Sequence, residues 1–264
     1  MNKLTEANVI VTTPLSPTIE EEELAIELAG LLGSNFGARD SRTISSLIRR
    51  HNVAATIVVG LKEIRLVYNG HSYGFHPNMA LHRVAALRSG KKDRLVEAAE
   101  LKSGDKVLDC TCGLGSDAVV AACAVGENGV VSALEASAVL AAIVRCGFRN
   151  YQHKESTMIE AMRHVTVINE DYASILPMLE SDSWDIVYFD PMFETTFANT
   201  KSIDLVRILG SYDQPSLEII NEAWRVARRS VVVKDRLPGK FLNAMDIPIV
   251  SNSKRVWYGR LDAS

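Results

Sequence analysis

The pattern of apolar and polar positions changes near residue 103. From Ser103 onward, short apolar runs typical of buried strands alternate with stretches of helical periodicity. Strands separated by helices predict βαβ units and a mostly parallel, doubly wound sheet. We therefore expect an α/β, Rossmann-like domain over residues 103–264 with a seven-stranded sheet. The predicted strands are Lys106–Cys110, Val130–Leu134, Val165–Asn169, Trp184–Asp190, Ser230–Lys234, Ile247–Val250 and Arg255–Arg260.

The first 80 residues show shorter and more mixed elements. Strand-like runs at Val9–Thr13, Thr56–Val59, Ile64–Tyr68 and Ser72–Phe75 are combined with helical patterns after Thr18 and over Ser41–Arg50. Asn69-Gly70 between two strand-like runs is a strong hairpin signal. Thr18, followed by an acidic stretch, is typical of a helix N-cap. We expect residues 1–80 to form a smaller N-terminal α+β domain that recognises substrate.

A basic helical connector is predicted over residues 81–102, with an interruption at Ser89-Gly90. It carries the densest group of cationic side chains in the chain, Arg83, Arg88, Lys91, Lys92, Arg94 and Lys102. Such a group is either a solvated helix surface or a face that contacts the phosphates of a nucleic acid. The pattern leaves both interpretations open.

Composition narrows the class of protein. Hydrophobic residues make up 47 % of the 264 residues and charged residues 23 %, which are ordinary globular values, and the net charge is −3. No apolar run approaches the roughly 20 residues of a membrane span, and the N-terminus shows no signal peptide. The four cysteines between Cys110 and Cys146 match neither a disulfide framework nor zinc spacing. We expect a cytoplasmic protein without a metal site.

A glycine-rich loop follows the first strand of the predicted sheet. It reads Asp109-Cys-Thr-Cys-Gly-Leu-Gly115 and opens a helix. Glycines allow a sharp turn and close approach of a ligand, and a helix N-terminus presents free N–H groups. The loop, with Asp109, Gly113 and Gly115, is thus a candidate cofactor-binding loop. Gly113, Gly115 and Ala118 also satisfy the dinucleotide fingerprint G-x-G-x-x-G/A, and a glycine turn without a ligand is a further interpretation.

Acidic residues follow the next two predicted strands. Glu135 lies about 20 residues after the loop, at a strand end where a carboxylate accepts hydrogen bonds from ribose hydroxyls. Asp171 follows the third strand and could accept from the amino group of an adenine. An Asp at this position is equally typical of a helix N-cap. Both alternatives stay open for Asp171.

Asp190-Pro191-Met192-Phe193 ends the fourth predicted strand and carries the candidate chemistry. The lone pair of an exocyclic amine is delocalised into its base, which makes the nitrogen a poor nucleophile. The Asp190 carboxylate and the Pro191 carbonyl can bind the N–H groups of such an amine, and Phe193 can stack on the base. This interpretation needs an activated methyl donor and no metal.

These four elements, in this order, resemble class I S-adenosylmethionine-dependent methyltransferases over about Ser103 to the C-terminus. A closer resemblance is to the small-subunit ribosomal RNA guanine-N2 methyltransferase family, whose loop is of the type Asp-Ala-Thr-Ala-Gly-Leu-Gly-Arg-Asp and whose catalytic loop contains Asp-Pro-Met-Phe-Pro. Here Ser116 replaces the Arg, and Glu194 replaces the last Pro. Val231–Lys234 resembles the strand after the catalytic loop. The resemblance implies RNA, in ribosomal RNA or the small ribosomal subunit, as the partner. It implies donor contacts at Ser116, Asp117, Glu135, Ala136, Asp171, Tyr172 and Asp190.

Three alternatives compete with this hypothesis. An NAD-dependent oxidoreductase would use the glycine loop and Glu135, but the chain lacks a Tyr-x-x-x-Lys motif, and Asp190-Pro191 stays unexplained. A methyl or aminopropyl transferase acting on a small molecule would share the donor site. A non-catalytic RNA-binding module would show no turnover.

Overall fold

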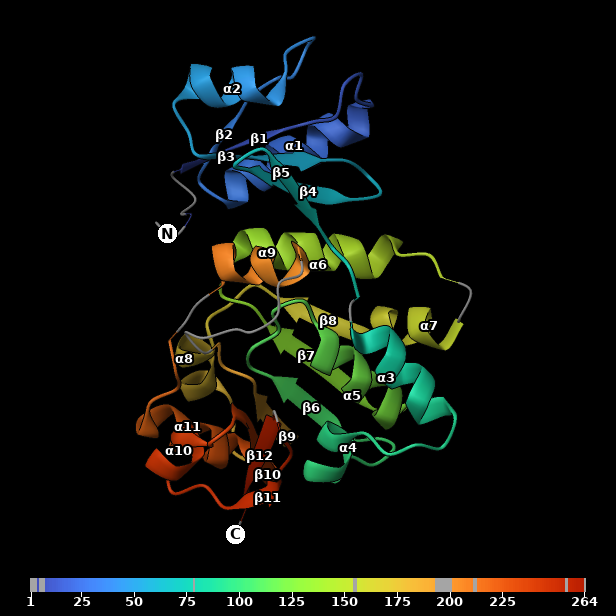
Figure 1. The fold of residues 1–264 in the computed structure, drawn as a ribbon, viewed down its shortest axis with the longest axis vertical. Helices are drawn as coiled ribbons and strands as arrows, with labels where there is room; N and C mark the ends of the chain where they lie inside the picture. Colours follow the sequence, from blue (N-terminus) through green and yellow to red (C-terminus); the bar gives the residue numbers. More distant parts are fainter. Residues whose placement is uncertain are drawn as a thin grey trace. The chain divides into compact units, whose positions relative to one another are not determined.

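A computed structural model shows how the chain folds. It describes residues 4, 8–77, 79–153, 156–192, 201–210, 213–254 and 256–263. The described chain forms two compact units (Figure 1). One unit comprises residues 1–76, 137–151 and 198–210, and the other comprises residues 77–136, 152–197 and 211–264.

The first unit is built on a mixed five-stranded sheet in the order β2-β1-β3-β4-β5. Its strands are β1 (Val9–Thr12), β2 (Asn35–Phe36), β3 (Ala55–Val59), β4 (Ile64–Tyr68) and β5 (His71–Gly74). Its helices are α1 (Ile19–Leu31), α2 (Ile44–His51), α6 (Ala138–Asn150) and α9 (Lys201–Leu209). β1 pairs in parallel with β2 and β3, whereas β3, β4 and β5 are antiparallel.

Local signals in the sequence explain two features of this unit. The Thr18 hydroxyl accepts from the Glu21 amide at 3.2 Å, and the Glu21 carboxylate accepts from the Thr18 amide at 3.0 Å. This capping box begins α1, so the predicted N-cap is confirmed. Asn69 and Gly70 adopt φ of +49° and +75° between the antiparallel strands β4 and β5, which confirms the predicted hairpin.

The second unit is built on a seven-stranded sheet in the order β11-β12-β10-β9-β6-β7-β8. Its strands are β6 (Lys106–Asp109), β7 (Val130–Leu134), β8 (Val165–Ile168), β9 (Trp184–Phe189), β10 (Ala227–Arg236), β11 (Ile249–Ser251) and β12 (Val256–Asp262). β8, β7, β6, β9 and β10 pair in parallel, and β12 is antiparallel to both β10 and β11. The predicted Rossmann-like, mostly parallel sheet is confirmed.

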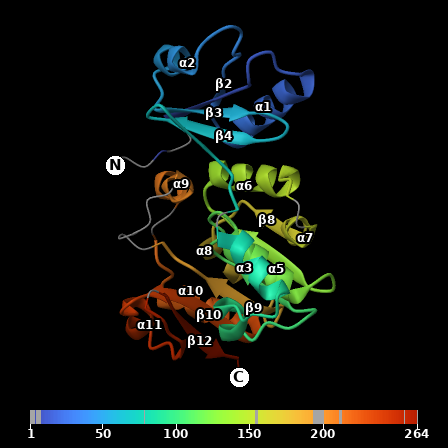
Figure 2. The same cartoon turned by 45° about the vertical axis from the view of Figure 1, so that its right-hand side comes forward.

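Helices lie on both faces of this sheet, as Figure 1 and Figure 2 show. The contacting group α3, α4, α5 and α7 covers one face, and α8 and α10 lie over the other. These helices are α3 (Met79–Arg88), α4 (Arg94–Ala98), α5 (Ser116–Val125), α7 (Ser156–His164), α8 (Tyr172–Ile175) and α10 (Leu217–Val226). A 3₁₀ turn (Leu176–Met178) follows α8. A further helix, α11 (Lys240–Ala244), packs on β10.

Side chains alternate between these two faces along each strand. Val187 and Phe189 of β9 belong to the apolar core under α10, together with Leu108 of β6. Because the side-chain period of a strand is two, Ile186 and Tyr188 point to the opposite face, toward α5. That opposite face carries the polar residues discussed below.

The basic stretch consists of two helices, divided where the sequence predicts an interruption. α3 and α4 are separated near Ser89-Gly90, where the sequence pattern is interrupted, and Gly90 adopts a left-handed φ of +77°. The Asp93 carboxylate accepts from the Leu95 amide at 3.0 Å and so caps α4.

Candidate active site

The glycine loop connects the carboxyl end of β6 to the first turn of α5. Gly113 and Gly115 have φ of +53° and +73°, a conformation that side chains with a Cβ adopt only with strain. A Cβ on Gly113 would meet no atom closer than the Thr111 carbonyl at 4.0 Å, so the space beside this residue is open. Ser116 begins α5, and no side chain among the described residues caps this helix start. The loop therefore leaves room and N–H groups for a ligand.

Neighbouring strands hold this loop in place. The Cys110 amide donates to the Tyr188 carbonyl at 2.8 Å, and the Cys112 amide donates to the Leu134 carbonyl at 2.9 Å. The loop thus lies at the edge of the sheet where the carboxyl ends of β6, β7 and β9 meet. In open α/β sheets this edge is where ligands bind.

Glu135 follows β7 and faces the loop. Its Oε2 accepts from the Gly113 amide at 2.9 Å, and the residue is only 7 % exposed. Asn169, after β8, donates to the carbonyls of Glu135 at 2.8 Å and of the exposed Ala136 at 3.3 Å. The structure therefore brings the Glu135 carboxylate next to the glycine loop, as a ribose-binding acid requires.

Asp171 is the N-cap of α8. Its Oδ1 accepts from the Ala173 amide at 2.8 Å, which is the second of the two roles that the sequence left open. Tyr172 packs edge-on against Phe189, and burial raises the pKa of its hydroxyl to about 12. Contact of Asp171 and Tyr172 with the donor stays a prediction.

Asp190 and Pro191 follow β9 directly. The Asp190 amide donates to the Thr111 hydroxyl at 2.6 Å, and the Thr111 amide donates to the Asp109 carboxylate at 2.9 Å. Thr111 therefore ties the Asp190-Pro191 turn to the glycine loop. Pro191 is buried, and Phe193 lies outside the described residues.

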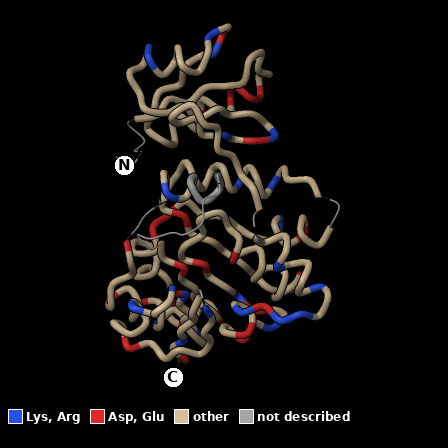
Figure 3. Tube along the Cα trace, viewed as in Figure 1, with Lys and Arg blue, Asp and Glu red and all other residues tan. Residues whose placement is uncertain are grey.

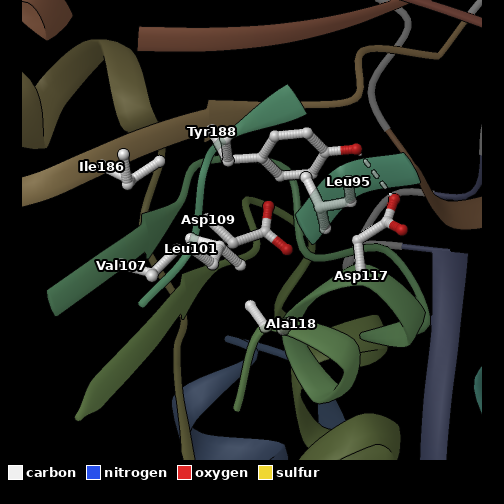
Figure 4. Close-up of a pocket in the computed structure, with 10 residues that line it drawn as sticks. Leu95, Leu101, Val107, Asp109, Asp117, Ala118, Ile186 and Tyr188 are labelled. Atoms are coloured by element: carbon white, nitrogen blue, oxygen red, sulfur yellow. Dashed lines mark hydrogen bonds between the residues drawn. The ribbon is translucent and has the colours of Figure 1, made fainter. Parts of the chain in front are cut away.

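A buried charge network lies behind this turn. The Lys234 ammonium, on β10, contacts the Asp190 carboxylate at 2.7 Å and the Asp117 carboxylate at 2.9 Å. Asp117 also accepts from the Tyr188 hydroxyl at 2.9 Å, a bond visible in Figure 4, and pairs with Arg83 of α3. The network joins four elements behind one carboxylate.

The charges in the network shift one another's protonation. Burial by itself raises the pKa of Asp117, but Lys234 and Arg83 bring that pKa below its ordinary value. Burial likewise lowers the pKa of Lys234, yet Asp117 and Asp190 more than offset this and hold it well above the ordinary range. Both groups are therefore ionised at neutral pH.

The network bears on the roles that the sequence predicted for Arg83 and Asp117. Arg83 does not contribute to a phosphate-contacting face, because its guanidinium is mostly buried and binds Asp93 at 2.8 Å as well as Asp117. The phosphate-binding hypothesis was wrong for this residue, since a carboxylate pair already uses its donors. The Asp117 carboxylate is likewise engaged by partners within the chain, and its contact with a donor stays a prediction.

Asp109 is a buried acid at the end of β6. It is 1 % exposed, and within the described part of the chain its Oδ2 has no hydrogen-bond partner. Burial raises its pKa to about 8, with help from the nearby Asp117 and Asp190. Asp109, Asp117 and Tyr188 border a cavity of about 10 Å³, which has room for roughly one water and is far too small for a nucleoside (Figure 4).

Reasoning from the sequence missed Thr111, Arg83 and Lys234 as members of the site. Thr111 lies inside the glycine loop, but nothing in the loop pattern shows that its hydroxyl reaches Asp190. A signal for Lys234 did exist, because a cation in line with Val232 on a buried strand needs a buried partner. Only the fold identifies that partner.

Metal-binding clusters, membrane-spanning helices and disulfides are absent from the described residues. No group of three or more His, Cys, Asp or Glu side chains in this part of the chain could hold a metal ion. None of its helices is long and apolar enough to cross a membrane. None of the four cysteines forms a disulfide within these residues.

Comparison with known proteins identifies the family. Residues 49–259 match the family model described as "Putative SAM-dependent methyltransferase". The chain belongs to this family, and S-adenosylmethionine is its methyl donor. This decides against the oxidoreductase that the glycine loop alone allowed.

The chain is also similar to individual known proteins. The chain is 35 % identical over 227 residues to the uncharacterized protein YpiP of Bacillus subtilis (strain 168), covering 86 % of this chain and 88 % of the relative. It is 30 % identical to ribosomal RNA small subunit methyltransferase J of Nitrosococcus oceani, over 63 % of this chain and 67 % of the relative. The crystal structure of the SAM-dependent methyltransferase NGO1261 from Neisseria gonorrhoeae shares the fold, with a TM-score of 0.65 and 17 % identity. The match covers 96 % of this chain and 95 % of that structure.

Proposed function

We propose that this methyltransferase transfers a methyl group to an exocyclic amine of a base in RNA, with guanine N2 of ribosomal RNA as the favoured target. The observation that carries the proposal is the bond from the Asp190 amide to the Thr111 hydroxyl at 2.6 Å. It joins the turn suited to an amine to the loop suited to the donor. Relatives named ribosomal RNA small subunit methyltransferase J support the choice of RNA.

The residues around the glycine loop fit the donor. The open space beside Gly113 accepts a ligand close to the backbone, and the Glu135 carboxylate suits a ribose diol. The buried Asp109 carboxyl, whose Oδ2 has no hydrogen-bond partner among the described residues, suits an N–H-bearing group. We assign the donor site to Asp109, Gly113, Gly115, Ser116, Glu135 and Ala136. S-adenosylmethionine supplies an activated methyl group when bound there.

Asp190 and Pro191 act on the acceptor. Two acceptors beside an exocyclic amine bind its N–H groups and localise the nitrogen lone pair. As the new N–C bond forms and the C–S bond of the methyl donor breaks, the amine loses one proton, and the Asp190 carboxylate is the base that the chain offers at this strand end. The target base must be unpaired or leave its stack to reach this turn.

Contact with the RNA backbone is assigned to exposed cations. Lys91 and Lys92 are exposed between α3 and α4, and Arg94 is exposed at the start of α4, where Figure 3 shows basic and acidic residues gathered. Arg49 and Arg50 are exposed at the end of α2, which supports a recognition role for residues 1–80. Ribosomal RNA as substrate and cysteines outside disulfides are both in keeping with a cytoplasmic location.

The proposal is tested by incubating the protein with labelled S-adenosylmethionine and with ribosomal subunits, bulk RNA or DNA from a strain that lacks the gene. The expected result is label on one base of small-subunit RNA, mapped by mass to guanine N2. Label on a small molecule alone, with none on any RNA, would contradict the proposal.

A further inference from the structure

Lys234 is a cation on β10 that directly follows the buried valines of this strand. Val231 and Val233 face the core under α10, so Val232 and Lys234 point to the opposite face of β10, the face that also carries Tyr188. There the Lys234 ammonium meets Asp190 at 2.7 Å and Asp117 at 2.9 Å. Its side chain is 20 % exposed. Partial burial of the ammonium costs solvation free energy, which the two carboxylates offset.

The groups that face Lys234 come from several elements. Asp117 lies on α5, Asp190 follows β9, and Tyr258 lies on β12. Asp190 also faces Arg236 of the same strand as Lys234. Asp117 has two further partners besides Lys234, the guanidinium of Arg83 and the Tyr188 hydroxyl. Anchoring Asp117 therefore does not depend on Lys234 alone.

We propose that Lys234 is a positioning residue for methyl transfer: its ammonium holds Oδ2 of Asp190, which fixes the carboxylate at the strand end and leaves Oδ1 to accept from the amine of the base. The inference rests on the proposed function, because it assigns Asp190 to the substrate amine. Without Lys234, Oδ2 of Asp190 would lose the ammonium that holds it at the strand end. The carboxylate would then leave the geometry that the amine requires.

The charge count guides the choice of variants. Arg83 and Lys234 are opposed by the carboxylates of Asp93, Asp117 and Asp190, so the network carries one net negative charge. K234M alone doubles this buried negative charge and can fail to fold for that reason. The double variant D117N/K234M restores the original net charge. D117N alone is its comparator, because the two differ only at Lys234.

The experiment measures kcat, the KM for RNA, donor affinity by calorimetry and the ¹³C titration of the Asp190 carboxyl in D117N, D117N/K234M and wild type. K240M is the matched control, since Lys240 is an exposed lysine on α11. We expect kcat of the double variant to fall on the order of 100-fold below that of D117N, with KM and donor affinity unchanged. The Asp190 titration should move to higher pH, because only the cation beside it is lost.

Two other results would each have a distinct meaning. A double variant with the kcat and the Asp190 titration of D117N would overturn the role of Lys234 and leave the proposed function standing. A wild-type protein that binds donor but methylates no RNA would overturn both. K240M should behave as wild type in every measurement.

Discussion

We predict that the substitution Asp109→Asn changes how the free energy of unfolding depends on pH. Burial raises the pKa of Asp109 to about 8 in the folded protein, whereas its ordinary value is 3.8. Between these values the native state holds a proton that the unfolded chain has lost. The contribution of Asp109 to stability is therefore fully present below about pH 4 and is lost as the pH rises toward about 8.

The magnitude follows from the same two values. Each pH unit in this window changes the free energy of unfolding by about 1.4 kcal/mol per proton. Between about pH 5 and about pH 8 the wild type should lose up to about 4 kcal/mol relative to D109N. Asn keeps the Oδ1 that accepts from the Thr111 amide but does not titrate, so the hydrogen bond to the loop is retained.

The assay is urea unfolding of both proteins at several pH values, compared as the difference between their free energies of unfolding. Most other titrating groups are common to both proteins and cancel in that difference. It should shift in favour of D109N as the pH rises. Two curves that stay parallel from about pH 5 to about pH 8 would refute the raised pKa and the burial argument behind it. An acid that costs stability at a ligand-binding edge is typical of a functional group.

Two further predictions concern donor and RNA. Glu135→Gln should weaken S-adenosylmethionine binding about tenfold in calorimetry, since hydrogen bonds to a charged acceptor are stronger by about 1–2 kcal/mol. The control is Glu127→Gln, which changes an exposed acid in the turn before β7 and should leave donor affinity unchanged. Equal donor affinities for the two variants would exclude Glu135 from the donor site. Reversing the charge at the exposed Lys91 and Lys92 should weaken RNA binding and reduce the slope of log K against log salt by about 1.4 for single-stranded RNA. An unchanged slope would remove both lysines from the RNA contact.

Much of the second unit could be predicted because its signals are local. The apolar run Val130–Leu134 is a strand with those bounds, and the glycine loop stands between a strand and a helix as expected. Helix α7 was not predicted, since its nine residues bury only a short apolar stripe, Met158, Ala161 and Met162. In the sheet, β12 lies between β10 and β11, an order that depends on long-range pairing rather than on any local pattern.

The candidate site divides in the same way. Glu135 and Asp190 were predictable, because strand ends in a parallel sheet meet at one edge. Lys234 and Asp117 are separated by 117 positions in the chain, and Arg83 and Asp117 by 34. Their contacts follow from how β10, α3 and α5 pack, which the sequence pattern does not specify. The network behind Asp190 therefore became visible only in the structure.

The central claim is that Asp190 serves the acceptor amine and not the donor or the fold alone. Methyl transfer from labelled S-adenosylmethionine to small-subunit RNA by wild type and Asp190→Ala tests it most directly, with donor calorimetry and thermal unfolding as controls. We predict that D190A stays folded, binds donor and loses at least about 100-fold in rate. A folded D190A protein that methylates RNA at the wild-type rate would contradict the account.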